Sequence, residues 1–217
     1  MDKIQGFVLA GGASRRMEEP KYALNIGGRT FVEIAANALR AATAKQLTVV
    51  GDIDNEYLKV KSADGEEHHL RKIQDIVFEL DLIKKKAVRG ALIGLYSAVT
   101  YAESEWIAVL ACDLPFVTAD LLTQLAGYCS DEFDAVVPVQ PDGQCQPLCA
   151  FYRRERAKTL AHKLIAAGDL KMQGFVSLLN TRFVDFEEIA ALDGSEKFFL
   201  NVNKPDDYKT ALTLSAA

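Results

Sequence analysis

An apolar run that ends abruptly in two glycines constrains this chain more than any other stretch. Residues 4–10 read Ile-Gln-Gly-Phe-Val-Leu-Ala, which is typical of a strand buried on both faces. Gly11 and Gly12 follow at once. Because glycine has no side chain, backbone N–H groups at this strand end can lie directly against a ligand. The stretch therefore predicts a buried strand that leads into a ligand-binding loop.

Positive charge follows closely after this strand end, at Arg15, Arg16 and Lys21. Fixed cations beside exposed backbone N–H groups suit a polyphosphate, whereas an ordinary turn with surface cations is the alternative. The loop is not a P-loop, since no Gly-Lys-Ser/Thr follows, and it is not the G-x-G-x-x-G dinucleotide fingerprint. We therefore expect a different nucleotide-binding scheme.

A second strand ends at a carboxylate. Residues 106–111 read Trp-Ile-Ala-Val-Leu-Ala, and Cys112-Asp113-Leu114-Pro115 follows. Open α/β sheets bind ligands beyond the carboxyl ends of their strands. One carboxylate together with substrate phosphates is a common way to hold Mg²⁺, which keeps several of its waters. Asp113 is therefore predicted to be a metal ligand, and a plain turn residue is the alternative.

Four separated motifs carry a resemblance to a known family. They are Leu9-Ala10-Gly11-Gly12-x-Ser14-x-Arg16-Met17 with Lys21, Cys112-Asp113-Leu114-Pro115, Gln146-Pro147-Leu148-x-Ala150-x-Tyr152, and Asn201-x-Asn203. Together they resemble the nucleotidyltransferases that act on the molybdenum cofactor, and among these the guanylyltransferases. Gly12 favours GTP by this resemblance, because relatives that use CTP usually carry Leu-Ala-Ala-Gly rather than Leu-Ala-Gly-Gly in this motif. Three residues depart from the family pattern: Glu18, Pro20 and Ala91.

The resemblance implies roles for particular residues. The catalytic group is Arg16, Lys21 and Asp113, with Arg15 a weaker candidate. The nucleotide-binding group is Leu9, Ala10, Gly11, Gly12, Lys21, Asp81 and Asp113. Asp113 would hold Mg²⁺, with Mn²⁺ as an alternative. The acceptor-binding group is Gln146, Pro147, Asn201 and Asn203. Asp81 fits a surface carboxylate at a strand end equally well.

The implied reaction transfers GMP from GTP to molybdenum-loaded molybdopterin and releases pyrophosphate. The implied partners are GTP, molybdopterin, and molybdoenzyme apoproteins or other cofactor-biosynthesis proteins. Two alternatives stay open. One is a related nucleotidyltransferase, either a cytidylyltransferase or a sugar-phosphate enzyme, and the other is a nucleotide-binding accessory protein without catalysis.

The expected fold is a single α/β domain over residues 1–217. It is a Rossmann-like three-layer αβα sandwich of the nucleotide-diphospho-sugar transferase type, mostly parallel, with a late antiparallel excursion. The expected strands span 4–10, 46–51, 76–80, 106–111, 134–140, 146–152 and 181–186. The expected helices span 31–42, 90–102, 119–129, 154–167 and 175–179, and Pro205 opens a last one. The basic residues of helix 154–167 suit a solvated face or a phosphate contact.

Composition narrows the function classes. A net charge of −5 gives no sign of nucleic-acid or anionic-membrane binding. No apolar stretch approaches the roughly 18 residues of a membrane span, and the four cysteines lack C-x-x-C pairing. We therefore expect a cytoplasmic enzyme with reduced thiols. Residues 52–75 are polar, and their His68-His69 pair favours a solvated turn over a metal site.

Overall fold

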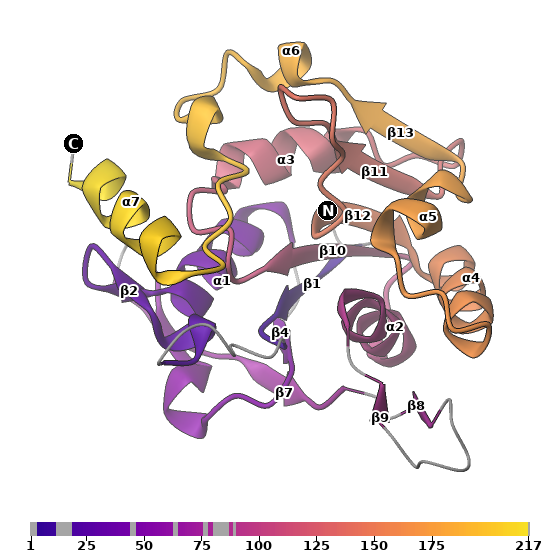
Figure 1. The fold of residues 1–217 in the computed structure, drawn as a ribbon, viewed down its shortest axis with the longest axis horizontal. Helices are drawn as coiled ribbons and strands as arrows, with labels where there is room; N and C mark the ends of the chain where they lie inside the picture. The colour runs from indigo at the N-terminus through magenta and orange to yellow at the C-terminus, as the bar shows by residue number, and fades with distance from the viewer. Residues whose placement is uncertain are drawn as a thin grey trace.

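A seven-stranded sheet forms the centre of the protein (Figure 1). The computed structural model describes residues 4–11, 19–43, 47–62, 65–75, 78–79, 87–88 and 90–216. In sheet order, the strands are β13 (Thr181–Val184), β11 (Ala135–Pro138), β12 (Cys149–Arg153), β10 (Trp106–Ala111), β1 (Ile4–Leu9), β4 (Thr48–Val50) and β7 (Arg71–Ile73). β10, β1, β4 and β7 are mutually parallel, whereas β12 runs antiparallel to both β10 and β11. The expected mostly parallel sheet with a late antiparallel excursion is confirmed.

Helices cover both faces of the sheet (Figure 1). α1 (Phe31–Ala42) and α3 (Ala119–Gly127) pack on one face. The other face is covered by α2 (Ala91–Tyr101), α4 (Arg154–Ala166) and α5 (Met172–Ser177). The remaining helices are α6 (Phe186–Ile189) and α7 (Pro205–Ser215), with single 3₁₀ turns η1 (Lys21–Ala23), η2 (Asn55–Leu58) and η3 (Ser195–Lys197).

The apolar character of β10, and of β1 apart from Gln5, is explained by burial on both faces of the sheet. Side chains alternate across a strand, so Val8 enters the core beneath α1 and α3 while Phe7 enters the core beneath α2 and α4. Every residue of both strands is buried. These two strands therefore form the rigid centre from which the adjoining loops emerge.

Thr30 fixes the start of α1 as the sequence predicts. Its hydroxyl oxygen accepts a hydrogen bond from the Glu33 backbone N–H at 3.3 Å, and the Glu33 carboxylate accepts one from the Thr30 N–H at 3.4 Å. This reciprocal pair is a capping box, which satisfies two donors at the helix end.

Thr30→Ala is expected to lower the free energy of unfolding by about 1 kcal/mol, because the helix loses its N-terminal acceptor. Urea unfolding followed by circular dichroism measures the change. Thr213→Ala, at an exposed threonine of α7, is the control and should leave stability nearly unchanged. Equal stability of the two variants would contradict the capping role.

Of the strand expected over 76–80, the described residues 78–79 do form a strand, but it lies outside the central sheet. The edge strand of the sheet is β7, at Arg71–Ile73, and residues 78–79 instead form β8 (Phe78–Glu79), which pairs with β9 (Ala87–Val88) in a separate hairpin. β7 lies at the sheet edge and buries fully only Ile73, so its sequence lacks the apolar run that marks a central strand. The more apolar stretch that follows was the stronger signal.

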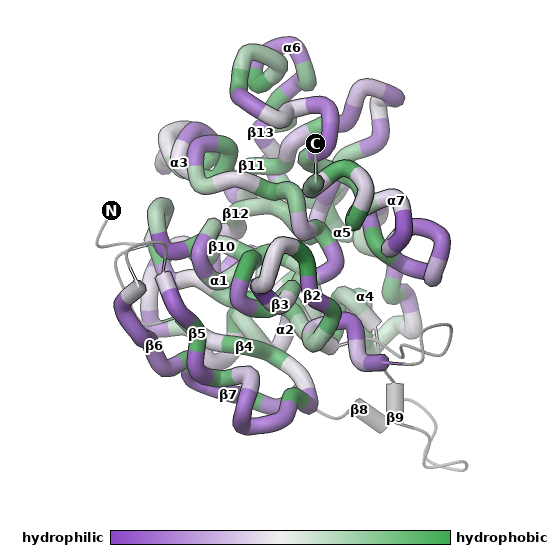
Figure 2. The backbone as a smooth tube through the Cα atoms, turned by 90° about the vertical axis from the view of Figure 1, so that its left-hand side faces the viewer, coloured by the Kyte–Doolittle hydropathy of each residue, from purple (hydrophilic) through white to green (hydrophobic). Residues whose placement is uncertain are grey.

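The polar region 52–75 contains more regular structure than the sequence indicates. β5 (Lys59–Lys61) and β6 (Glu67–His69) form an antiparallel hairpin before β7. Figure 2 shows this hairpin coloured mostly as hydrophilic. The His68 ring nitrogen Nε2 lies 3.3 Å from the Ser62 hydroxyl and 3.8 Å from a Glu66 carboxylate oxygen. These local contacts account for His68 as part of a solvated hairpin.

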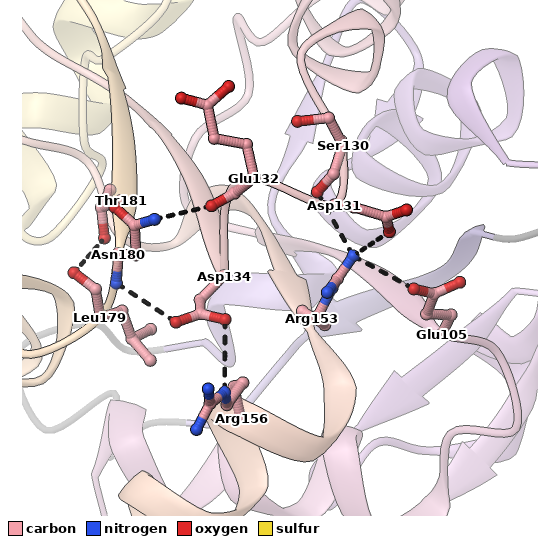
Figure 3. A network of polar contacts seen from close by, with 10 residues as sticks. All are labelled: Glu105, Ser130, Asp131, Glu132, Asp134, Arg153, Arg156, Leu179, Asn180 and Thr181. Atoms are coloured by element: carbon pink, nitrogen blue, oxygen red, sulfur yellow. Dashed lines mark hydrogen bonds and ion pairs between the residues drawn. The ribbon is translucent and has the colours of Figure 1, made fainter.

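A network of charged side chains lies at the edge of the sheet where β10 begins and β12 ends (Figure 3). Arg153 pairs with Asp131 at 2.5 Å and with Glu105 at 3.3 Å, and its guanidinium lies over the Trp106 ring. Arg153 sits opposite Trp106 in the ladder, at the amino end of β10. The basic start of α4 therefore lies at the edge away from Asp113. A phosphate held by the start of α4 would therefore lie outside a site formed at the carboxyl ends of the parallel strands.

No helix in the described part of the chain is both long enough and apolar enough to cross a membrane.

Candidate functional site

The carboxyl ends of four parallel strands meet at one edge of the sheet. Backbone hydrogen bonds join them: Ala10 N–H donates to Val50 O at 2.9 Å, and Cys112 N–H donates to Leu9 O at 3.1 Å. Gly51 N–H donates to Ile73 O at 3.0 Å. The segments that follow β1, β4, β7 and β10 therefore leave the sheet side by side. This is where an open α/β sheet binds its ligand.

Three predicted site residues come together at this edge. Lys21 Nζ donates to Asp113 Oδ2 at 2.8 Å and also to Asn203 Oδ1. The Lys21 and Asp113 side chains are each 20% exposed, so the pair is accessible yet partly withdrawn from water. Lys21 begins η1, Asp113 follows β10, and Asn203 precedes α7. A short charge-assisted contact thus joins three segments that lie far apart in the sequence.

The C-terminal segment is fastened directly to the loop after β10. Val202 N–H donates to Asp113 O at 2.9 Å. Asp207 Oδ2 then accepts from the backbone N–H groups of Asn203 and Lys204, at 2.9 and 3.1 Å. Proline at the first helical position of α7 and acids in its first turn suit this helix start, as the sequence predicts. The arrangement fixes Asn203 beside Lys21, while Asn201 lies half-buried two residues earlier.

The glycine after β1 is tightly enclosed by neighbouring segments. Gly51 has a φ of +132°, and a Cβ added there would lie 2.8 Å from Gly11 N. A Cβ added at Gly11 would lie 3.2 Å from Asp75 Oδ2. Gly51 therefore requires glycine, because of its φ and the close backbone of Gly11, whereas a side chain at Gly11 would have to displace the Asp75 carboxylate slightly.

Gly51→Ala is expected to destabilise the protein by about 1–3 kcal/mol, because alanine strains this φ and its Cβ collides with Gly11. GTP affinity should fall as well, since the displaced segment is the one that follows β1. Calorimetry measures both quantities. Gly127→Ala, in α3 where an added Cβ meets no atom within 4 Å, is the control; it should leave GTP affinity unchanged and should not destabilise the protein. If Gly51→Ala destabilises the protein but leaves GTP affinity unaltered, the expectation that the segment after β1 contacts GTP is contradicted.

Asp75 is a carboxylate that the sequence did not single out. It lies two residues after β7, beside Gly11, and 3.8 Å separates its Oδ1 from a Cβ built at Gly94 near the start of α2. Placing the strand at 76–80 pointed instead to Asp81. The signal that could have found Asp75 is its position just after the apolar Ile73, which the polar start of β7 obscured.

Tyr22 ties the Lys21 segment to the loop after β4. Its hydroxyl donates to Asp54 Oδ2 at 3.1 Å, and its ring packs edge-on against Tyr57 with centroids 5.3 Å apart. Burial raises the pKa of Tyr22, and the hydrogen bond to Asp54 raises it further. Tyr22 therefore stays protonated as a donor and restrains the residue next to Lys21.

Gln146 and Pro147 belong to residues 145–148, which we call the strap. The strap crosses from the end of β11 to the end of β10 at the carboxyl edge of the sheet. Gln146 N–H donates to Pro138 O at 2.9 Å, and Ala111 N–H donates to Leu148 O at 2.8 Å. The buried Tyr152 hydroxyl donates to Pro147 O at 2.7 Å. The Gln146 side chain is itself buried. The strap thus connects the end of β11 with the end of β10, two residues before Asp113.

The cysteine thiols among these elements are poorly suited to act as nucleophiles. Burial raises the pKa of Cys149 and of Cys129 to about 12, and burial beside Asp113 raises the pKa of Cys112 well above its usual range. All four thiols are free. Because the thiolate is the reactive form, Cys112, Cys129 and Cys149 remain poor nucleophiles at neutral pH.

Several predicted site residues lie outside the residues that the structure describes: Gly12, Arg15, Arg16 and Asp81. Leu9, Ala10 and Gly11 are described and form the end of β1 and the start of its loop. The described geometry of the site therefore rests on Lys21, Asp113 and Asn203, with Asp75 beside the glycine.

An open, mostly parallel sheet with a glycine-ended strand and a lysine–carboxylate contact at its carboxyl edge defines an α/β enzyme of the nucleotide-binding kind. Residues 6–182 match the family model described as MobA-like NTP transferase domain. The chain belongs to this family and is a nucleotidyltransferase.

Two relatives of similar length carry the same description. A "Probable molybdenum cofactor guanylyltransferase" of Geobacillus sp. is 30% identical over 213 residues, covering 98% of this chain and all of that protein. A protein of Bacillus cereus with the same description is 33% identical over 211 residues, with 97% and 96% coverage.

Solved structures share the fold. An Archaeoglobus fulgidus protein described as molybdopterin-guanine dinucleotide biosynthesis protein A has a TM-score of 0.72 at 24% identity, with 98% of each chain covered. A Mycobacterium tuberculosis protein crystallised with manganese has a TM-score of 0.62 at 21% identity, also with 98% of each chain covered. These likenesses confirm the fold.

Proposed function

We propose that this enzyme transfers GMP from GTP to molybdenum-loaded molybdopterin, giving molybdopterin guanine dinucleotide and pyrophosphate. The description shared by its full-length relatives supports this substrate pair. The observation that carries the chemistry is the contact of Lys21 with Asp113 and Asn203 at the carboxyl edge of the sheet. It joins the predicted nucleotide side to the predicted acceptor side at one point.

On the nucleotide side, the backbone of Leu9, Ala10 and Gly11 would lie along the triphosphate, continued by Gly12. Lys21 would neutralise phosphate charge, and Arg16 would do the same. Asp75 lies beside Gly11 and is a candidate for a nucleotide contact, in addition to the sequence-based candidate Asp81. Such fixed donors and cations need little reorganisation when negative charge shifts toward the leaving group.

The residues present fit a divalent metal at Asp113. A partly exposed carboxylate at a strand end is a hard oxygen ligand, and Mg²⁺ is commonly held by one such group together with substrate phosphates. A bound Mg²⁺, or Mn²⁺ as an alternative, would stabilise negative charge on the α-phosphate and the leaving pyrophosphate. Asp113 would hold the ion, and Lys21 would balance the charge beside it.

The chain's own residues mainly align two anions. The terminal phosphate of the acceptor is already a nucleophile, so no strong general base is needed. Lys21 and Asn203 would orient the approaching phosphate, and Gln146, Pro147 and Asn201 would line the acceptor side. Holding two reactants in register removes much of the entropic cost of their encounter. We propose that cofactor-biosynthesis proteins or molybdoenzyme apoproteins exchange the acceptor and product in the cytoplasm.

Pyrophosphate release tests the choice of nucleotide. Purified protein with Mg²⁺ and molybdenum-loaded molybdopterin is supplied with GTP or CTP in parallel. The fold alone does not choose the base, because an Anaerococcus prevotii protein described as a 4-diphosphocytidyl-2C-methyl-D-erythritol synthase shares it, with a TM-score of 0.67 at 12% identity.

Selective turnover with GTP supports the proposal and the assignment from Gly12. Preference for CTP contradicts that assignment but leaves the transfer chemistry in place. No turnover with either nucleotide, alongside an active control enzyme, contradicts the proposed reaction.

A further inference from the structure

A cavity of about 610 Å³ opens beside the strap that carries Gln146 and Pro147. This volume lies within the roughly 300–1,000 Å³ typical of small-molecule sites. Three separate segments line it: residues 139–145, α5, and the end of β13. The lining residues are Val139, Gly143, Gln144, Cys145, Gln173, Phe183 and Asp185. The predicted acceptor residues named above do not include any of them.

The cavity lies at the same sheet edge as Asp113. β11 and β13 are parallel to each other, and both run antiparallel to β12, as does β10. Val139 directly follows β11 and Asp185 directly follows β13, so both lie at the carboxyl edge. Val139 and Cys145 form a β-bridge. The strap then runs from Cys145 to Leu148, whose carbonyl oxygen accepts a hydrogen bond from the Ala111 N–H. One continuous segment thus connects the cavity with the end of β10.

The walls combine an apolar surface with a few polar groups. Phe183 is 39% exposed, which is unusual for an aromatic ring, and Val139 and Cys145 add apolar area. Gln144 and Gln173 supply amide donors and acceptors, and Asp185 supplies a carboxylate. An aromatic face with amides and a carboxylate at its rim suits a flat heterocycle that presents adjacent N–H donors at one edge.

We propose that this cavity binds the pterin ring of the acceptor, with the ring stacked on Phe183 and its 2-amino-4-oxopyrimidine edge hydrogen-bonded by the rim residues. The inference rests on the proposed function, because the pterin is the ring that its acceptor carries. The acceptor phosphate would then extend along the strap toward Lys21 and Asp113.

Guanine carries the same 2-amino-4-oxopyrimidine edge and is the other possible source of this chemistry. The glycine-ended strand, Asp75 and the loop after β4 lie on the far side of β10 from β11 and β13. The triphosphate expected at Gly11 therefore favours the pterin in the cavity. The test separates the two rings.

The experiment measures binding and turnover separately. Fluorescence titration gives the Kd of free pterin and of molybdopterin, and calorimetry gives the Kd of GTP. The variants are Phe183→Ala, which removes the stacking face, and Gln173→Ala, which removes a rim amide. Leu178→Ala is the control, since Leu178 is an exposed apolar residue next to α5 that does not line the cavity.

Phe183→Ala is expected to weaken pterin binding by about tenfold, a typical loss for one stacked ring, with GTP affinity unchanged. Gln173→Ala should weaken it less, and Leu178→Ala should not alter it. Equal pterin binding in Phe183→Ala and the wild type overturns the proposal, as does an absence of pterin binding by the wild type at millimolar concentration. A loss of GTP affinity in Phe183→Ala assigns the cavity to guanine and also overturns it.

Turnover distinguishes failure of this inference from failure of the proposed function. If Phe183→Ala loses pterin binding but the wild type transfers no guanylyl group, the cavity assignment stands and the proposed reaction fails. If Phe183→Ala transfers the guanylyl group with an unchanged KM for molybdopterin, the proposed reaction stands and the cavity assignment fails.

Cys145 offers a second readout that needs no substitution. Its thiol lines the cavity, and mass spectrometry can follow its alkylation by a maleimide. Pterin should slow alkylation of Cys145 several-fold in the folded protein, whereas in denatured protein the alkylation rate should be the same with and without pterin. Protection by GTP but not by pterin would overturn the assignment.

Discussion

Asp113→Asn is expected to lower guanylyl transfer by at least about a thousandfold, the largest effect of any single substitution at the site. The change keeps the size of the side chain but removes its charge. The substituted amide is a far weaker ligand for a divalent ion, and it no longer forms the ion pair with Lys21 Nζ at 2.8 Å. Initial rates of pyrophosphate release at saturating GTP and molybdopterin measure the loss.

Stability separates this effect from misfolding. The Asp113 side chain is partly exposed, and such ion pairs contribute little to the free energy of unfolding, so the melting temperature should change little. Asp193→Asn, at an exposed carboxylate before η3, is the matched control and should retain full activity. An active and metal-dependent Asp113→Asn enzyme would remove Asp113 from the catalytic group.

Lys21→Met has the second largest expected effect, a loss of about a hundredfold or more in kcat. Methionine keeps most of the length and volume of lysine but removes the ammonium that donates to both Asp113 and Asn203. The two substrates would then lose the cation placed between the nucleotide and acceptor sides. Single-turnover rates with enzyme in excess over GTP isolate the chemical step.

Two further variants sharpen the result for Lys21. Lys59→Met removes an exposed lysine of β5, whose nearest carboxylate is 4.0 Å away, and should leave the rate unchanged. Lys21→Arg keeps the charge but is expected to restore only part of the rate, because a planar guanidinium cannot reproduce a compact ammonium between two oxygens. Full activity of Lys21→Met would contradict the role assigned to this contact.

The centre of the fold could be predicted because its strands carry strong local signals. β10 is an uninterrupted apolar run, and β1 is apolar except for Gln5; such runs are typical of strands that are buried on both faces of a sheet. Thr30 likewise marked the start of α1, because threonine is a preferred N-cap residue and a helical apolar pattern follows it directly. Lys21 was singled out by its place after the glycine-ended strand, and Asp113 by its place after β10. They were expected to lie close together because open α/β sheets bind ligands beyond the carboxyl ends of their strands.

Other features depend on packing that a single sequence does not display. β7 is a three-residue edge strand with a polar start, so Asp75 was overlooked in favour of Asp81. The cavity beside Phe183 was also missed, because its walls come from three segments that only the fold brings together. A short edge strand carries only a weak apolar signal in the sequence, and a pocket built from separate segments carries none. A central strand is marked by its apolar run.

Direct detection of the product tests the central claim, that this site joins GTP to molybdopterin. Purified wild-type enzyme and Asp113→Asn are incubated with Mg²⁺, GTP and molybdenum-loaded molybdopterin, and the products are identified by mass spectrometry. We predict that the wild type forms molybdopterin guanine dinucleotide in equal amount to pyrophosphate, and that Asp113→Asn forms neither. Pyrophosphate without the dinucleotide, or equal product from both proteins, would contradict the claim.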